Sequence, residues 1–242
     1  QRGYTLAAGY NDAQNKINCK KLIVVPEKQL SNREQRASAL PYAIDQNEQD
    51  LCLSQIVELS IAHLSNQERF FIMAEGGKID YASHANDGGT MLHEVIDFDK
   101  AIDVAYQFYL QHPDETLIVV TADHETGGLA LGNSDYTLNL KVLSGQKCSS
   151  DILSDQLSAI QKSKGKALKW EDVKSIISEN TGLYTNVELS TEEDELLQNS
   201  FARMMRHQEQ LKTLYKDINK LAADALGILN QKSRLGWTTN GH

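Results

Sequence analysis

The sequence predicts an α/β fold in which parallel strands end at clusters of acidic and imidazole side chains. Two short apolar runs, 71–74 and 116–122, have the length of buried strands, and residues 97–111 between them carry apolar residues at helical spacing. A strand, a helix and a second strand over this length form a βαβ unit, whose crossover makes the strands parallel. Both strands are then expected to end at one edge of a sheet, where ligands bind in open α/β folds.

The first apolar run leads directly into a carboxylate and a diglycine. Glu75 follows the run, and Asp80 and His84 come after Gly76-Gly77. In a helix, residues at the spacing of Asp80 and His84 lie on one face, so the carboxylate and the imidazole can share a cation. A single pair of this kind is more often a surface ion pair, so on its own it does not indicate a metal site.

The second apolar run repeats the arrangement. Asp123 and His124 follow it directly, and the diglycine Gly127-Gly128 comes shortly afterwards. Because the two strands are expected to be parallel, both clusters should emerge at the same edge of the sheet. The repeat therefore favours one shared pocket over two unrelated surface pairs.

Local patterns predict the remaining elements. A β-branched run predicts a strand over 22–25, apolar spacing predicts a helix over 53–64, and alternation over 136–142 predicts a half-exposed strand. From 147 to 233 the sequence is polar and mainly helical, with a capping box at Ser190 and Glu193 and an amphipathic stripe over 211–229. This region contains no catalytic motif, and we interpret it as a helical insertion that covers the sheet or the pocket.

The composition argues against some classes of partner. The 242 residues carry a formal net charge of -9, whereas binding to nucleic acid needs clustered Lys and Arg. No stretch predicts a membrane span, and no signal peptide is recognised, so any export signal is expected outside this sequence. The cysteines, Cys19, Cys52 and Cys148, have the spacing of neither a disulfide framework nor a metal site.

Several motifs together give the sequence a family resemblance. They are Glu75-Gly-Gly-Lys-Ile-Asp80 with His84, Thr121-Ala-Asp123-His124-Glu-Thr-Gly-Gly, Gly236-Trp-Thr-Thr-Asn-Gly-His242, and Leu40-Pro-Tyr-Ala-Ile-Asp45 upstream. With these motifs the chain resembles the alkaline phosphatases over most of its length. The resemblance implies a three-layer αβα sheet, of which this chain supplies the C-terminal portion with its mainly helical insertion.

The resemblance also implies a set of metal ligands. Asp80, His84 and His242 would hold one zinc ion, Asp123 and His124 would hold a second zinc ion, and Glu75 would hold a magnesium ion. These side chains suit the ions, because zinc takes imidazole and carboxylate ligands and magnesium takes oxygen ligands. Tyr81 stands where family members differ, and it either touches the substrate, tunes the metal or only packs.

Part of such an enzyme is expected to lie outside this chain. The family's nucleophilic serine follows an aspartate, and the dipeptide Asp-Ser does not occur here. The phosphate-binding arginine and the remaining metal ligands have no matching motif either. The parent protein is expected to hydrolyse phosphate monoesters to inorganic phosphate through a phosphoserine, whereas the chain alone is expected to bind metal weakly and to be inactive.

The resemblance also implies how the chain is divided into domains, where the parent protein is located and how it assembles. We expect half of the metal-binding core over 1–135, the helical insertion over 136–235, and a return to the core over 236–242. The parent is expected in the periplasm or outside the cell, and its relatives suggest a homodimer. Two alternatives stay open, a phosphodiesterase or phosphomutase with the same metal motifs, and a scaffold without catalytic activity.

Overall fold

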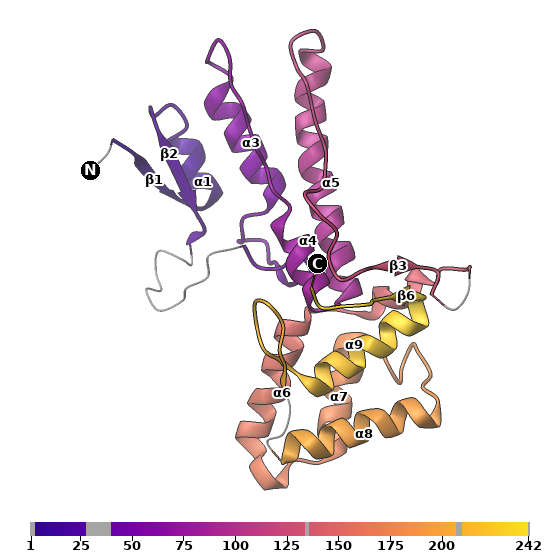
Figure 1. Ribbon diagram of the computed structural model, residues 1–242. Coiled ribbons are helices and arrows are strands. Elements are labelled where there is room, and N and C mark those ends of the chain that lie inside the picture. Colours follow the sequence, from indigo (N-terminus) through magenta and orange to yellow (C-terminus); the bar gives the residue numbers. More distant parts are fainter. Residues whose placement is uncertain (1–2, 28–39, 134–135, 207–209, 242) are drawn as a thin grey trace. The chain divides into compact units, whose positions relative to one another are not determined.

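A computed structural model describes residues 3–27, 40–133, 136–206 and 210–241, which form two compact units (Figure 1). The first unit comprises Gln1–Gly76 and His93–Thr121, and the second comprises Gly77–Leu92 and Ala122–His242. Each unit is therefore built from segments that are separated in the sequence. The predicted division at residues 135 and 235 follows motifs rather than packing, and it stays a prediction.

The first unit contains a small parallel sheet near the start of the chain. Strand β1 (Thr5–Ala8) pairs in parallel with β2 (Leu22–Val25), and helix α1 (Gly9–Asn15) connects them. The strand predicted over 22–25 is thus confirmed. The sheet packs on a small apolar cluster in which Ala7, Ala13 and Leu59 are buried. A βαβ unit therefore exists, but it lies earlier in the chain than the sequence predicts.

The first unit also contains one further helix and most of another, whose first turn belongs to the second unit. The helix predicted over 53–64 is confirmed as α3 (Leu53–Leu64), and α5 (Gly88–Gln111) starts before the predicted residue 97 and continues to the predicted end. The short helix η1 (Ala43–Asp45) is fixed to α5, because the backbone N–H of Ala43 donates to Glu94 Oε1 over 2.6 Å. The upstream part of the family motifs is thereby held on α5.

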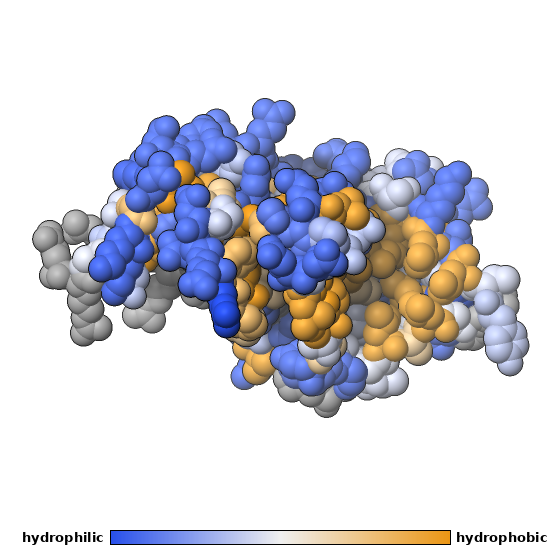
Figure 2. All heavy atoms as spheres, turned by 90° about the horizontal axis from the view of Figure 1, so that it is seen from above, coloured by the Kyte–Doolittle hydropathy of each residue, from blue (hydrophilic) through white to orange (hydrophobic). Residues whose placement is uncertain are grey.

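The two apolar runs at 71–74 and 116–122 are not strands and are not buried, so this prediction was wrong. Met73 is 82% exposed and Leu117 is 87% exposed. Strand backbone groups bond to neighbouring strands, and the described residues supply no neighbour to either run. Phe70 makes an edge contact with Phe108 of α5, with ring centroids 5.8 Å apart. Figure 2 shows hydrophobic residues reaching the surface among hydrophilic ones.

The second unit is mainly helical, which confirms the prediction for residues 147–233. It contains α4 (Gly77–His84), β3 (Ala130–Leu131), η2 (Leu140–Gly145), α6 (Ser150–Lys164), η3 (Gly165–Ala167), α7 (Trp170–Thr181), α8 (Thr191–Met205), β4 (Gln210–Leu211), β5 (Ile218–Asn219), α9 (Lys220–Ser233) and β6 (Leu235–Gly236). The predicted capping box is confirmed, because Ser190 Oγ accepts from the N–H of Glu193 and the Glu193 carboxylate accepts from the N–H of Ser190.

Two predictions in this unit were wrong. The amphipathic stripe over 211–229 is not one helix, because β4 and β5 form an antiparallel hairpin and α9 starts only at Lys220, capped by Asn219. The strand predicted over 136–142 is absent from the described residues, where η2 begins at Leu140. There the backbone N–H of Asn139 donates to the carbonyl of Ser233 at the end of α9, instead of to a strand.

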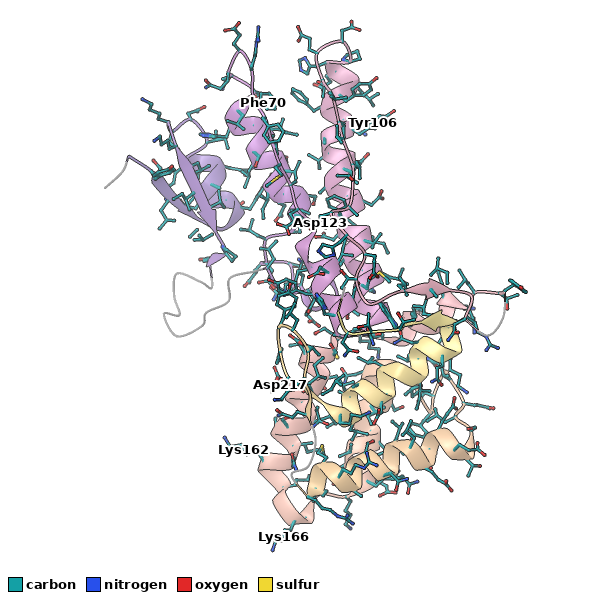
Figure 3. All side chains as sticks on the ribbon, viewed as in Figure 1. Phe70, Tyr106, Asp123, Lys162, Lys166 and Asp217 are labelled. Atoms are coloured by element: carbon teal, nitrogen blue, oxygen red, sulfur yellow. The ribbon has the colours of Figure 1, made fainter. Side chains whose placement is uncertain are left out.

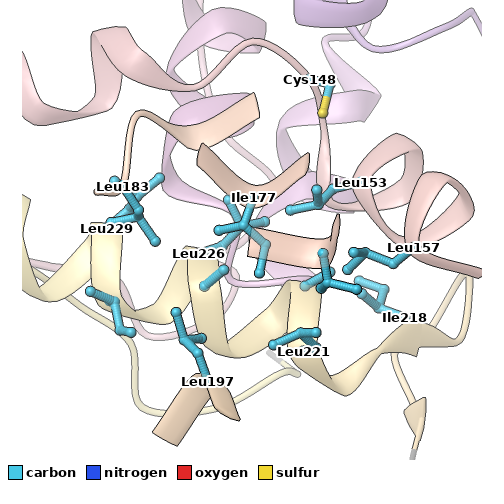
Figure 4. Close-up of a cluster of buried hydrophobic side chains, with 14 of the residues drawn as sticks. Cys148, Leu153, Leu157, Ile177, Leu183, Leu197, Ile218, Leu221, Leu226 and Leu229 are labelled. Carbon is cyan, nitrogen blue, oxygen red and sulfur yellow. The ribbon is translucent and has the colours of Figure 1, made fainter. Parts of the chain in front are cut away.

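The core of the second unit lies between α9 and the helices α6, α7 and α8, which all pack against it (Figures 1 and 4). Its fully buried side chains include Leu157, Ile177, Leu197, Leu221 and Leu229. Burying a side chain of this size stabilises a fold by roughly 1.5 to 3 kcal/mol. This core gives the unit its stability, and it fixes α9 and the segment that follows it. Among the described helices, none combines the length and the hydropathy that crossing a bilayer requires.

Asp151, in the first turn of α6, makes the stability of this unit depend on pH. Burial raises the pKa of its carboxyl group, although Lys216 Nζ lies 3.9 Å from Asp151 Oδ2 and acts in the opposite direction. The folded state therefore binds this proton more tightly than the unfolded state. The resulting stabilisation is present below the ordinary pKa of an aspartate, about 3.9, and is lost as the pH rises through the folded pKa.

Asp151→Asn is accordingly expected to raise the thermal unfolding midpoint at pH 7, and the gain should vanish near pH 3. The midpoint measured by circular dichroism at both pH values checks this. Asp155→Asn is the matched control, because Asp155 lies one turn further along α6 and is exposed, with both its oxygens 3.0 Å from Lys216 Nζ. An equal gain at both pH values, or a loss at pH 7, would contradict the assignment to Asp151.

Candidate metal centre

Helix α4 places Asp80 and His84 side by side. Asp80 Oδ1 lies 3.3 Å from His84 Nε2, and the His84 side chain is only 1% exposed. On the other side of the ring, His84 Nδ1 lies 2.7 Å from the backbone carbonyl of Asn240. Because a carbonyl oxygen only accepts, Nδ1 carries a proton, which leaves Nε2, beside Asp80, as the nitrogen that can bind a metal ion. Metal-binding histidines commonly have this orientation.

The second cluster repeats this geometry. His124 Nε2 lies 3.5 Å from Asp123 Oδ2, and His124 Nδ1 lies 2.8 Å from the backbone carbonyl of Glu125. The hydrogen bond to that carbonyl, followed by the charges of Asp123 and Asp80, raises the pKa of the His124 imidazole. In contrast to the buried His84, this pair is open to solvent. Figure 3 shows Asp123 at the α4 end of the second unit, away from Lys162 and Lys166.

Thr126 connects the two clusters. Its hydroxyl group donates to Asp80 Oδ1 over 2.7 Å and lies 3.3 Å from His124 Nδ1. The structure therefore brings Asp80 and His124 to one side-chain oxygen, although they are far apart in the sequence. Sequence reasoning missed Thr126. The signal was its place in the block between His124 and the diglycine, where a hydroxyl group can reach a neighbouring carboxylate.

The diglycine allows the C-terminal segment to reach this site. Gly127 has a φ of +78°, and a Cβ there would lie 2.7 Å from Trp237 Cε3, while a Cβ at Gly128 would collide with the Thr238 hydroxyl group. The N–H of Gly127 donates to the carbonyl of Gly241 over 2.8 Å. Strand β3 also pairs antiparallel with β6, upstream of these contacts. This packing brings the Asn240 carbonyl to His84.

The other candidate residues take different places. Glu75 is exposed and belongs to the first unit, and its part in a metal site stays a prediction. His242 lies outside the described residues. Tyr81, on α4, stacks on Tyr215 with ring centroids 3.6 Å apart, and Lys78 Nζ lies 4.9 Å from the centroid of the Tyr81 ring. His93, on α5, is exposed.

The donor atoms present are suited to zinc. In residues 3–27, 40–133, 136–206 and 210–241, no group of three or more His, Cys, Asp and Glu side chains is placed to hold a metal ion. The two pairs nevertheless offer imidazole nitrogens beside carboxylate oxygens, which are preferred zinc ligands. Their outer contacts, from the carbonyls of Asn240 and Glu125 and from the Thr126 hydroxyl, are those that orient such ligands.

Comparison with known proteins places the chain in a family. A family model described as alkaline phosphatase matches residues 36–242. The chain belongs to the alkaline phosphatase family. Its repressible relative in Saccharomyces cerevisiae is 28% identical over 222 residues, covering 84% of this chain and 36% of the yeast protein. The tissue-nonspecific alkaline phosphatase of Gallus gallus is 41% identical over 85 residues, covering 34% of this chain and 16% of that protein.

Solved structures of alkaline phosphatases show the same fold. The cold-active enzyme from a psychrophilic Shewanella sp. superposes with a TM-score of 0.73 at 27% identity, covering 100% of this chain and 51% of that enzyme. The Thermus thermophilus enzyme superposes with a TM-score of 0.68 at 20% identity and supports the fold alone. The predicted α/β class is thus confirmed. The prediction that this chain corresponds to only a part of such an enzyme is confirmed as well. The chain spans about half the length of these solved relatives.

Proposed function

We propose that this chain carries the metal-binding part of a phosphomonoester hydrolase. The observation that supports this most directly is the matched geometry of His84 and His124. In each ring Nδ1 faces a backbone carbonyl and Nε2 faces an aspartate oxygen. Family membership favours a phosphatase over the phosphodiesterase or phosphomutase that the sequence left open.

Within this proposal each described residue has a defined task. Asp80 and His84, with His242, would hold one zinc ion, Asp123 and His124 a second, and Glu75 a magnesium ion. When bound, the ions would supply positive charge that stabilises the oxygens of a transferring phosphoryl group. The carbonyls of Asn240 and Glu125 keep the ring protons on Nδ1, and Thr126 holds the Asp80 carboxylate, so the donor atoms are oriented before a metal arrives.

The nucleophilic serine of the phosphoserine route would come from the part of the enzyme that relatives have and this chain does not span. We therefore expect no metal-dependent release of nitrophenol from nitrophenyl phosphate by the chain alone. Turnover that depends on zinc and survives repurification would show that the chain carries its own nucleophile. Export to the periplasm or the cell exterior, and assembly as a homodimer, stay predictions.

Zinc titration tests the proposed site itself. His84→Gln and His124→Gln should each weaken zinc binding by about a hundredfold or more, because loss of a ligand should exceed the tenfold to hundredfold effect of outer contacts. Isothermal calorimetry against the unmodified chain measures this. His112→Gln is the control, because His112 is exposed and belongs to the first unit. Equal zinc affinity in all four proteins would favour the scaffold without catalytic activity.

A further inference from the structure

The loop between β4 and β5 reaches the candidate metal centre from the helical insertion. Tyr215 of this loop stacks on Tyr81 of α4, with an angle of 15° between the ring planes. Its hydroxyl group donates to Asp80 Oδ2 over 2.8 Å. The ring also makes an edge contact with His84, with centroids 5.4 Å apart. One side chain of the insertion thus touches both members of the first Asp-His pair.

The two oxygens of Asp80 are held by different elements. Thr126 donates to Oδ1, which is also the oxygen beside His84 Nε2, and Tyr215 donates to Oδ2. The Tyr215 contact therefore lies on the oxygen away from His84, and it fixes the rotation of the carboxylate about its last bond. A carboxylate fixed in this way loses less conformational freedom when it binds a cation.

The loop that carries Tyr215 is itself anchored. The Thr213 hydroxyl donates to the carbonyl of Lys216 over 2.6 Å and closes the turn. Lys216 Nζ bonds both oxygens of Asp155 on α6, and the N–H of Asn219 donates to Ser154 Oγ over 2.8 Å in a buried contact. These bonds attach the loop to α6 through residues that directly follow Tyr215 in the sequence. These contacts fix the loop, and they therefore fix the position from which the Tyr215 hydroxyl reaches Asp80.

We propose that Tyr215 is a positioning residue for the zinc ion held by Asp80 and His84. The proposal rests on the proposed function, and it assigns the helical insertion a share in the metal site. Tyr215 would act through Asp80 and not as a ligand. The stack on Tyr81 sets the position of the phenol ring, and the hydroxyl group supplies the hydrogen bond.

Tyr215→Phe tests this with the 242-residue chain, because it keeps the stacked ring and removes only the hydroxyl group. Zinc affinity measured by calorimetry should fall about tenfold to a hundredfold, the range found for outer partners of metal ligands. Tyr136→Phe is the matched control, because Tyr136 is fully exposed in the same unit. Its zinc affinity should equal that of the unmodified chain.

A second measurement separates positioning from a general loss of structure. Without zinc, the thermal midpoint of Tyr215→Phe should match that of the unmodified chain, whereas the rise in midpoint on adding zinc should be smaller. Equal or tighter zinc binding by Tyr215→Phe would overturn the role of Tyr215 and leave the proposed function standing. Absence of zinc binding by the unmodified chain would overturn the proposed function and this inference with it.

Discussion

Asp87→Ala is expected to lower the free energy of unfolding of the second unit by about 3 kcal/mol, since buried donors that lose their acceptor cost roughly 1 to 3 kcal/mol each. Asp87 is fully buried and lies between the starts of α5 and α6. Its Oδ1 accepts from Gln146 Nε2 over 2.7 Å and from the N–H of Thr90. Its Oδ2 accepts from the N–H of Ser150 over 2.7 Å and from the Thr90 hydroxyl.

The position of the Asp87 carboxylate explains how its charge is stabilised without a lysine or arginine partner among the described residues. The first N–H groups of a helix carry partial positive charge and have no partner within the helix. Thr90 and Ser150 supply such groups from α5 and α6. Asp87→Asn should lower the free energy of unfolding by less than Asp87→Ala does, because the amide oxygen still accepts two of these bonds. The bonds to the other oxygen are lost, because an NH₂ group there would face donors.

Denaturant unfolding followed by tryptophan fluorescence measures the change, because both tryptophans, Trp170 and Trp237, belong to the second unit. Asp155→Ala is the control for removing a negative charge near α6 at an exposed position, and it should change the unfolding free energy by less than about 1 kcal/mol. If Asp87→Ala were no worse than Asp155→Ala, the cost of burying the charge would equal the gain from its hydrogen bonds.

The second large effect is a contrast between two leucines. In the chain alone, Leu157→Ala should lower the free energy of unfolding by about 3 kcal/mol, whereas Leu117→Ala should leave it almost unchanged. Leu157 is fully buried in the core of the second unit, and Leu117 is 87% exposed in the extended run at 116–122. In a protein that also contains the part of the enzyme that relatives possess, Leu117→Ala should become destabilising by about 2 kcal/mol or more.

The reason is that the runs at 71–74 and 116–122 have strand composition but pair with no strand in the part of the chain that the structure describes. The missing neighbours are expected in the half of each solved relative that this chain does not span. Thermal unfolding of both variants, in the chain and in the longer protein, measures the contrast, and binding of a hydrophobic dye should fall in the longer protein. A large cost of Leu117→Ala in the chain alone would mean that this run is already packed.

The features that sequence reasoning found correctly depend on neighbours close in the chain. The helix over 53–64 and the capping box at Ser190 and Glu193 were predicted to the residue, because their signals lie within one or two turns. The two apolar runs were misassigned for the opposite reason, since strand pairing is non-local. The stripe over 211–229 failed because Asn219 caps a helix start inside a continuous apolar pattern.

In the candidate site, too, sequence reasoning found the residues that lie in local motifs and missed a residue that is brought in by folding. Asp80, His84, Asp123 and His124 were visible because each pair sits in a short motif. Tyr215 carries no motif, and it meets Asp80 across 135 residues of sequence. Only the folded hairpin, tied to α6 through Lys216, shows why this tyrosine faces the carboxylate.

The contact between His84 and Asn240 has a consequence for the order of events during biosynthesis. The two residues are separated by 156 positions. The hydrogen bond between the imidazole and the carbonyl can therefore form only after almost all of this sequence has left the ribosome. A nascent chain that has only just produced α4 holds the acid and the ring without the group that sets the ring's tautomer. Selective capture of a cation would then be a late step, and a truncated product ending before residue 235 should stay poor at retaining zinc.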